Sequence, residues 1–453
     1  MSIETAVLDP VIEIEAPQER SAASAILAGV PEGQNADLPE WFQARQVEAW
    51  MRFASLPMPT RSDQPWRFSN VKALDLAPYV VQDTIGDADR REILERSVSL
   101  DEVAGRLIYA DDQLLRRDPL PEKLRSLGVI LKPLERGLIE HEDLFRKHFM
   151  AQPAELGSAK FAALHEAFVR SGTFVYVPRG VEVELPIEIF HWLASDNASV
   201  FPHTLLIADE LSKVTVIEHF RSARPSSRGF ACGVNDLVVG RGAKINYICA
   251  QNWNENVLAL QMNTTTVERD ASGKSLNLHL GGAYSRFESL SRITGEGGRS
   301  DLLSVSVGHG AQEFDARTLQ DHASPHTTSD LLYKNSLSDR SRNTFGGLIR
   351  VEPHAHFTDA YQTVRNLLLS DDSEANSMPG LEIMADNVRC SHGATSGQID
   401  EDELFYLLAR GIPKNVAQHL LVAGFLNEVV ERLDHPMIAA KLHDMIEAKF
   451  ARR

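Results

Sequence analysis

VEVELPIEI, the stretch at residues 181–189, alternates five apolar side chains with three glutamates and a proline. Successive side chains of a β-strand point to opposite faces, so this period of two predicts a strand with one apolar face. Shorter stretches of strand-like composition follow at residues 213–217, 244–248, 302–307, 348–351 and 381–384. The stretch at 181–189 therefore predicts the start of a region built mainly from β-strands.

Polar or glycine-containing turns separate these strands at intervals of roughly 30 residues, a spacing typical of stacked repeats. Examples are Gly240-Arg241-Gly242 and the glycine-rich turn at residues 295–298. The intervals differ too much in sequence for a strict hexapeptide solenoid, and the Asn-Gly or Asp-Gly turns expected of a sandwich are scarce. The predicted core is therefore an irregular β-helix with one coil for about every 30 residues.

Both ends of the chain show helical periodicity instead. Residues 39–56 and 144–170 repeat apolar side chains at helical spacing, whereas residues 87–131 mix short helix and strand patterns. Residues 1–35 predict a mobile lead followed by a short helix. We therefore predict a mainly helical N-terminal region at 1–170, a β-helix core at 171–399 and a C-terminal helical region at 400–453.

The C-terminal region contains three helical segments with clear boundaries. Asp400 and Glu403 have the spacing of a capping box, and Gly411 and Pro413 end the helix that they begin. Two further apolar faces follow at residues 416–433 and 438–446, separated by a proline at 436. These helices either cover the open end of the β-helix or bind a partner, and their periodicity alone does not distinguish the two roles.

Composition narrows the class of protein. The chain has 453 residues, of which 43% are hydrophobic and 24% charged, as in soluble globular proteins. Its net charge of −17 argues against nucleic-acid binding, because phosphates would be repelled. No stretch resembles a signal peptide or a membrane span, so we expect a cytoplasmic protein that does not contact the membrane.

The cysteines are few and unpaired in sequence. Cys232, Cys249 and Cys390 form no CxxC pair, so free thiols are expected and a self-contained cluster or zinc site is not. Cys232 and Cys249 lie among small or apolar neighbours and are predicted to be core thiols.

Cys390 and His392 are the strongest candidates for chemistry. They stand in the motif Cys-Ser-His-Gly-Ala-Thr at residues 390–395, where a strand pattern gives way to a helix pattern. Two residues apart on an extended segment, they point to the same side, and thiolate and imidazole suit iron, zinc or copper(I). Two ligands make only half of a site, so the motif predicts a contribution to a shared site. A polar turn at the end of the solenoid is the alternative.

Two other constellations have weaker support. His354 and His356 flank an alanine, which on a strand would suit a metal-dependent, cupin-like enzyme, but Asp359 stands where that pattern wants a glutamate. Exposed polar residues on a rung are the simpler interpretation. Asp371-Asp372 would suit a β-helix polysaccharide lyase, although Ser-Asp-Asp-Ser-Glu is also an ordinary turn composition.

The chain resembles the SufB/SufD family of iron–sulfur cluster assembly proteins. The resemblance rests on stretches that occur in the family's order, together with Pro65-Trp66-Arg67-Phe68 nearer the N-terminus. These stretches are residues 172–181, 315–322, 328–337, 346–351, 363–369, 376–381, 390–396 and 403–411.

The resemblance implies a mainly β protein with a right-handed parallel β-helix core and helical regions at both ends. It also implies a non-enzymatic subunit that pairs with a SufB-like chain and with the ABC-type ATPase SufC, which binds the ATP. A transient iron–sulfur cluster would form at the interface with SufB, with His392 as metal ligand and Cys390 as a second contact. The C-terminal helices would contact SufC, and the family admits a homodimer when SufB is absent.

Within the family, the chain has the SufD form. SufB-like chains carry an N-terminal cysteine cluster, a scaffold cysteine and glutamates on both sides of the histidine. Here no cysteine precedes Cys232, Val364 stands near the scaffold position, and Ser391 and Gly393 flank His392. A lone histidine and cysteine cannot supply the four ligands of a usual cluster, so we expect this chain to contribute ligands to a shared site and not to form a complete site by itself.

Overall fold

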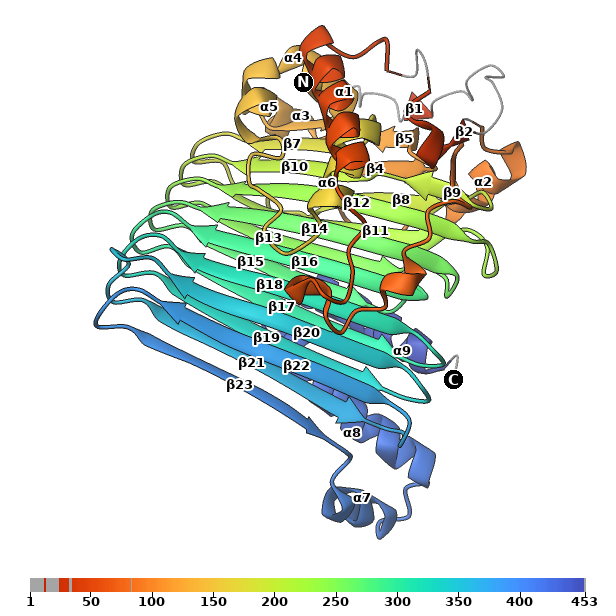
Figure 1. Ribbon diagram of the computed structural model, residues 1–453, viewed down its shortest axis with the longest axis vertical. Coiled ribbons are helices and arrows are strands. Elements are labelled where there is room, and N and C mark those ends of the chain that lie inside the picture. Colours follow the sequence, from red (N-terminus) through yellow and green to blue (C-terminus); the bar gives the residue numbers. More distant parts are fainter. Residues whose placement is uncertain (1–11, 14–23, 32–34, 83, 452–453) are drawn as a thin grey trace, which may run out of the picture.

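The computed structural model describes residues 12–13, 24–31, 35–82 and 84–451, and its central feature is a parallel β-helix (Figure 1). The predicted mobile lead at residues 1–35 lies mostly outside the described residues. Among the described residues, no helix combines the length and the apolar character needed to cross a membrane. The core confirms the predicted fold class, with helical segments before and after the solenoid in the chain.

Two sheets form the coils, and the chain alternates between them. One sheet stacks β8 Ile187–Leu193, β11 Lys213–Ser222, β13 Lys244–Asn252, β15 Ser272–His279, β17 Arg299–Gly308, β19 Thr328–Leu337, β21 Asp359–Leu368 and β23 Arg389–Gly397. The other includes β9 Ala198–Val200, β12 Gly229–Val239, β14 Val257–Val267, β16 Tyr284–Ile293, β18 Glu313–His322, β20 Arg342–Val351 and β22 Glu374–Ile383, with β7 Thr173–Val177 and β10 His203–Ala208 beside its first coil.

The register confirms the predicted repeat. Lys213 pairs with Lys244, and Lys244 pairs in turn with Ser272, so each coil uses roughly 30 residues. Paired residues of a parallel ladder share a face, and columns of like side chains therefore run along the solenoid.

The stretch at 181–189 is only partly the strand that its alternation predicts. Strand β8 begins at Ile187, and the preceding residues touch the sheet through a single bridge between Glu182 and Lys213. Proline at 186 has no N–H to donate to a ladder, which accounts for the late start. Glu188 is buried, because its carboxylate pairs with the guanidinium of Arg106 at 2.7 Å and contacts His219 at 3.1 Å.

The N-terminal region adds both helices and strands to the first coils (Figure 1). Its helices are α1 Glu40–Ser55, α2 Asp87–Arg96, α3 Glu122–Ser126, α4 Leu134–Glu140, α5 Glu142–His148 and α6 Ala159–Phe168, with 3-10 turns at Ile26–Ala28, Gln64–Trp66 and Val71–Ala73. Its strands are β1 Ile12–Glu13, β2 Ser24–Ala25, β3 Val80–Val81, β4 Gly105–Ala110, β5 Gln113–Asp118 and β6 Ile130–Pro133. The helix predicted over 144–170 is interrupted between α5 and α6, where Pro153 and Gly157 break it.

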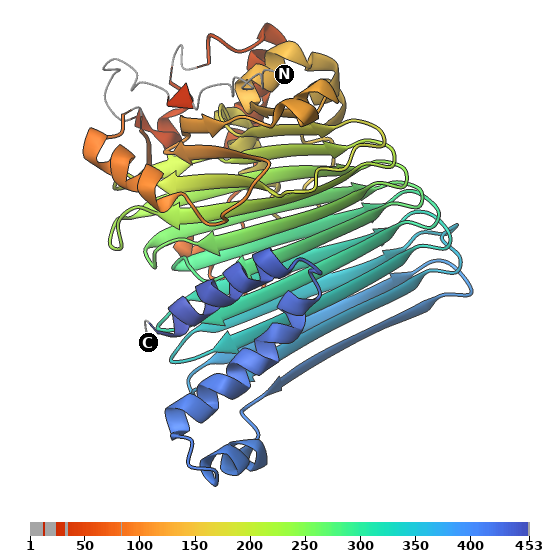
Figure 2. The same cartoon turned by 180° about the vertical axis from the view of Figure 1, so that it is seen from behind.

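Helices cover the outer faces of both sheets. Helices α1 and α6 pack on the sheet that contains β12 and β14, through a cluster with Phe53, Phe161 and Leu260. Helices α8 Lys414–Glu431 and α9 Pro436–Phe450 lie across the other sheet (Figure 2), where Leu426 and Leu442 pack against strands of β15, β17 and β19. Most of the apolar side chains predicted for these faces are therefore buried against the solenoid's side, whereas Val416 and Leu420 at the start of α8 stay exposed. The two helices do not cover the solenoid's open end.

Three buried histidines make the fold sensitive to acid. Burial lowers the pKa of His219, His279 and His322 to about 4 each, whereas the unfolded chain binds protons near the usual histidine pKa of about 6.5. Between those values the unfolded state holds more protons, so the free energy of unfolding should fall as the pH drops from 7 to 5, by about 1–2 kcal/mol per histidine. Urea unfolding at both pH values measures this, and His279→Gln should reduce the slope. Equal stability at pH 7 and 5 would contradict it.

Candidate functional site

The last coil of the solenoid is left open. Strand β22 pairs with β20 and strand β23 pairs with β21, and within the described residues neither has a strand on its other edge. Figure 1 shows both strands at the end of the stack farthest from the N-terminal helices. Their free edges present unpaired N–H and C=O groups, which readily accept a further strand.

Cys390 and His392 both lie on β23 and face the inside of the solenoid. Cys390 is in register with Ala360, and His392 with Gln362. Ala360 and Gln362 are buried, whereas Tyr361 between them is exposed, so the shared face points into the lumen. The side chain of Cys390 is half-buried and that of His392 is exposed, because no coil follows β23.

The Cys390 thiol sits in an apolar setting. It packs beside a buried cluster formed by Ile349, Val351, Ala355 and Ala360. Burial, and then the negative charge of Asp359, raises the pKa of the Cys390 thiol above its usual value. The thiolate is the form that binds metals, so Cys390 is a weak ligand until a bound metal displaces its proton.

No complete metal site forms within the described residues. No group of three histidine, cysteine, aspartate or glutamate side chains there is placed to hold a metal ion. Cys390 and His392 are therefore a pair of candidate ligands with one open side. Cys232 and Cys249 do not join them, because both are buried, as the sequence predicts for core thiols.

The histidines of the cupin-like alternative do not lie on a strand. His354 and His356 occupy the turn between β20 and β21. The His356 ring nitrogen Nδ1 lies 3.1 Å from the carbonyl oxygen of Asp386 in the next turn. Residues in a turn do not project to one side as alternate residues of a strand do, so the cupin-like interpretation loses its geometric basis. Asp371-Asp372, the pair of the lyase alternative, also lies in a turn, between β21 and β22.

Apolar side chains at the end of β22 form an exposed rim at the same open coil as the candidate ligands, and the sequence did not reveal this rim. Leu381, Ile383 and Met384 at the end of β22 are 36%, 42% and 44% exposed. Leu381 and Ile383 are in register with the buried Ile349 and Val351, so they are core positions that lack a covering coil. A strand was expected at residues 381–384, but periodicity alone does not tell which coil is the last.

A second exposed apolar surface lies on α7 Glu401–Leu408 and the start of α8. Asp400 caps α7 as expected, accepting hydrogen bonds from the backbone N–H groups of Asp402 and Glu403. Helix α7 projects beyond the solenoid (Figure 2). Its exposed side chains, which we call the α7 patch together with those on α8, are Phe405 (69%), Tyr406 (57%), Leu408 (37%), Val416 (44%) and Leu420 (50%). Large exposed apolar patches mark interaction surfaces.

The chain matches two family models in sequence order. Residues 35–189 match the SufBD protein N-terminal region, and residues 191–425 match the SufBD core domain of the SUF system of FeS cluster assembly. The second match covers more than half of the chain and includes every coil of the solenoid after the first.

Curated relatives agree with these matches. The chain is 28% identical over 424 residues to the iron–sulfur cluster assembly protein SufD of Bacillus subtilis, which covers 91% of this chain and 94% of the relative. It is 29% identical over 314 residues to SufB of the same organism, covering 69% of this chain and 67% of the relative. A SufBD family protein of Staphylococcus saprophyticus is 25% identical over 406 residues, covering 87% and 86%. With a SufBD core match over more than half of its length and a parallel β-helix fold, the chain belongs to the SufB/SufD family of iron–sulfur cluster assembly proteins.

Proposed function

We propose that this chain is a non-catalytic, SufD-type subunit of a cytoplasmic SUF assembly complex. Its open β-helix end would meet a SufB-like chain, and the nascent iron–sulfur cluster, which is cargo, would form between the two. The observation that carries the proposal is the placement of Cys390 and His392 side by side on an edge strand, with no third ligand in the described residues. An incomplete ligand set at an open strand edge is what a shared site requires.

The edges of β22 and β23 favour a partner of the same architecture. Their free backbone groups suit strand addition, and the rim of Leu381, Ile383 and Met384 offers apolar area for a second core to cover. A SufB-like chain belongs to the same family and would bring a comparable coil end, so the two would meet about a pseudo-twofold axis. A homodimer through the same edges follows by the same reasoning when SufB is absent.

The α7 patch is the proposed contact for the SufC ATPase. Helices α8 and α9 are packed on the solenoid, so their buried faces are unavailable, and the aromatic pair Phe405 and Tyr406 is the most exposed part of the α7 patch. Docking of such side chains into a groove is a common mode of helix recognition. ATP would be bound by SufC, and α8 would transmit a movement of SufC to the sheet near the open end.

Two variants with reciprocal outcomes test this division of surfaces. Ile383→Lys places a charge on the apolar rim and should abolish co-purification with a SufB-like chain while the ATPase is retained. Phe405→Asp places a charge on the α7 patch and should do the opposite. Each loss should amount to at least about tenfold in affinity, since burying an unpaired charge costs several kcal/mol. Tandem affinity purification from cells that express all three chains measures both.

Each variant is the control for the other, and Leu211→Lys is a third. Leu211 is 60% exposed in a turn and is far along the sequence from both surfaces. The Leu211→Lys variant should bind both partners normally. Retention of the SufB-like chain by Ile383→Lys, or of the ATPase by Phe405→Asp, would refute the corresponding contact.

A further inference from the structure

Gln362, on β21, carries a buried amide without a partner. Its side chain is 1% exposed, and neither Oε1 nor Nε2 has a hydrogen-bond partner in the described structure. Buried amides are nearly always hydrogen-bonded, because an unpaired donor or acceptor away from water destabilises the fold. The described structure therefore leaves the partner of this amide unassigned, and a small rotation of a neighbouring side chain could supply one.

The position of Gln362 points to His392 as that partner. The two residues are in register on adjacent parallel strands, so their side chains lie on the same face, one strand spacing of about 4.8 Å apart. His392 is on the outermost strand, and its ring makes no hydrogen bond to the described residues. The amide of Gln362 therefore lies one strand further into the stack than the imidazole of His392, on the same face of the sheet.

Gly347, on the opposite sheet, borders the space that the Gln362 amide occupies. A Cβ atom at position 347 would lie 2.5 Å from Cζ of Phe345 and 2.7 Å and 2.8 Å from Oε1 and Nε2 of Gln362, closer than non-bonded atoms approach. A glycine on β20 therefore leaves the space that the amide occupies across the lumen. The amide is confined between the two sheets and does not extend freely toward solvent.

We infer that Gln362 is a positioning residue for His392. Its Oε1 accepts a hydrogen bond from one ring N–H of His392, which selects a single tautomer and leaves the lone pair of the other nitrogen directed at the open side, where iron would bind. Outer hydrogen bonds of this kind orient metal-binding histidines. The inference rests on the proposed role of His392, but it concerns the orientation of the ring and can be tested without cluster assembly.

Nuclear magnetic resonance of the full chain labelled with ¹⁵N-histidine tests it. The His392 ring signals are those that disappear in His392→Ala. In the unsubstituted chain they should report one dominant tautomer. Gln362→Met, which has a similar shape but no carboxamide oxygen, should give mixed tautomers, whereas Gln362→Glu retains an oxygen and should restore one tautomer.

Gly347→Ala should reproduce the effect of Gln362→Met, because its Cβ displaces the amide. The matched control is Gly380→Ala on β22, where a Cβ would meet its nearest atom, Cδ1 of Leu348, at an ordinary 3.4 Å. Gln362→Met should also lower cluster assembly about tenfold, the usual scale for outer-shell partners. Identical ring signals in the unsubstituted chain, Gln362→Met and Gly347→Ala would overturn the inference. The proposed function would survive that result if His392→Ala still abolished assembly.

Discussion

Replacing His392 with alanine should leave the chain folded and bound to its partners while reducing cluster assembly by more than about tenfold, the scale on which metal sites lose function. The ring is exposed at the open end, so its removal should change the free energy of unfolding by less than about 0.5 kcal/mol. What is lost is an imidazole at a site where Cys390 is the one other candidate ligand among the residues that the structure describes. Complementation of a SufD-deficient strain under iron limitation measures assembly, and co-purification measures the complex.

Two further variants define the site. His354→Ala removes an exposed histidine from the turn before β21 and should assemble clusters normally. Cys390→Ser should retain partial activity, because burial keeps the Cys390 thiol protonated and makes it a secondary ligand. Normal complementation by His392→Ala would remove the basis for the shared site. Loss of complementation by His354→Ala would instead support the metal-dependent, cupin-like enzyme.

The second large effect is expected from Arg286→Ala, which should destabilise the fold by about 3–5 kcal/mol. Arg286 is buried, and its guanidinium pairs with Asp315 at 2.6 Å and with Glu288 at 2.8 Å. It also lies 3.7 Å from the ring centre of Trp66. Burial opposes its charge, but Asp315 and Glu288 outweigh that effect and raise the pKa of Arg286 above its usual value. Alanine would leave two buried carboxylates without this cation.

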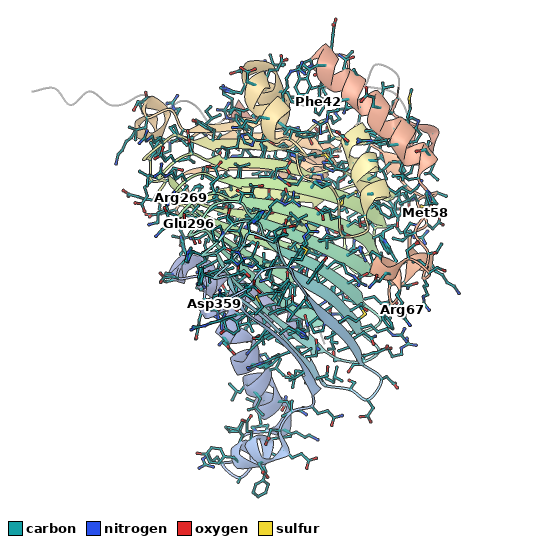
Figure 3. All side chains as sticks on the ribbon, turned by 60° about the vertical axis from the view of Figure 1, so that its left-hand side comes forward. Phe42, Met58, Arg67, Arg269, Glu296 and Asp359 are labelled. Carbon is teal, nitrogen blue, oxygen red and sulfur yellow. The ribbon has the colours of Figure 1, made fainter. Side chains whose placement is uncertain are left out.

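The loss should appear as detachment of the N-terminal segment from the solenoid before global unfolding. Trp66 donates a hydrogen bond to the carbonyl of Gly157, and Arg67 follows it on the same segment (Figure 3). Hydrogen exchange near Trp66 and urea unfolding measure the effect. The matched control is Arg269→Ala, since Arg269 is exposed and pairs with Glu296 at 3.3 Å between neighbouring turns (Figure 3). Such surface pairs contribute about 1 kcal/mol or less. Equal effects of the two substitutions would contradict this account.

Sequence patterns predicted the elements that depend on residues close together in the chain. Alternation and turn spacing predicted the coils, and the cap at Asp400 predicted the start of α7, because both depend on residues close in the chain. The same patterns predicted a strand over 181–189 that begins only at Ile187, and a continuous helix over 144–170 that is two helices. In both cases a proline interrupts backbone hydrogen bonding while the side-chain period continues.

The candidate ligands were accessible from sequence, whereas their surroundings were not. The motif at 390–395 contains both ligand types, and the strand period places Cys390 and His392 on one face. That this face is the lumen, that Gln362 lies beneath His392 and that Gly347 leaves room for its amide depend on the register between strands roughly 30 residues apart. Local periodicity contains no information about that register.

Composition and local pattern alone thus predict an irregular β-helix with helical ends, free cysteines and two candidate ligands. The arrangement in space was needed to learn that α8 and α9 cover the side of the solenoid, that α7 stays exposed, and that β22 and β23 have unpaired edges. An apolar helical stripe looks the same in sequence whether it packs on its own chain or on another. Which surfaces remain free follows from the order in which distant segments stack, because burial is a property of the whole fold.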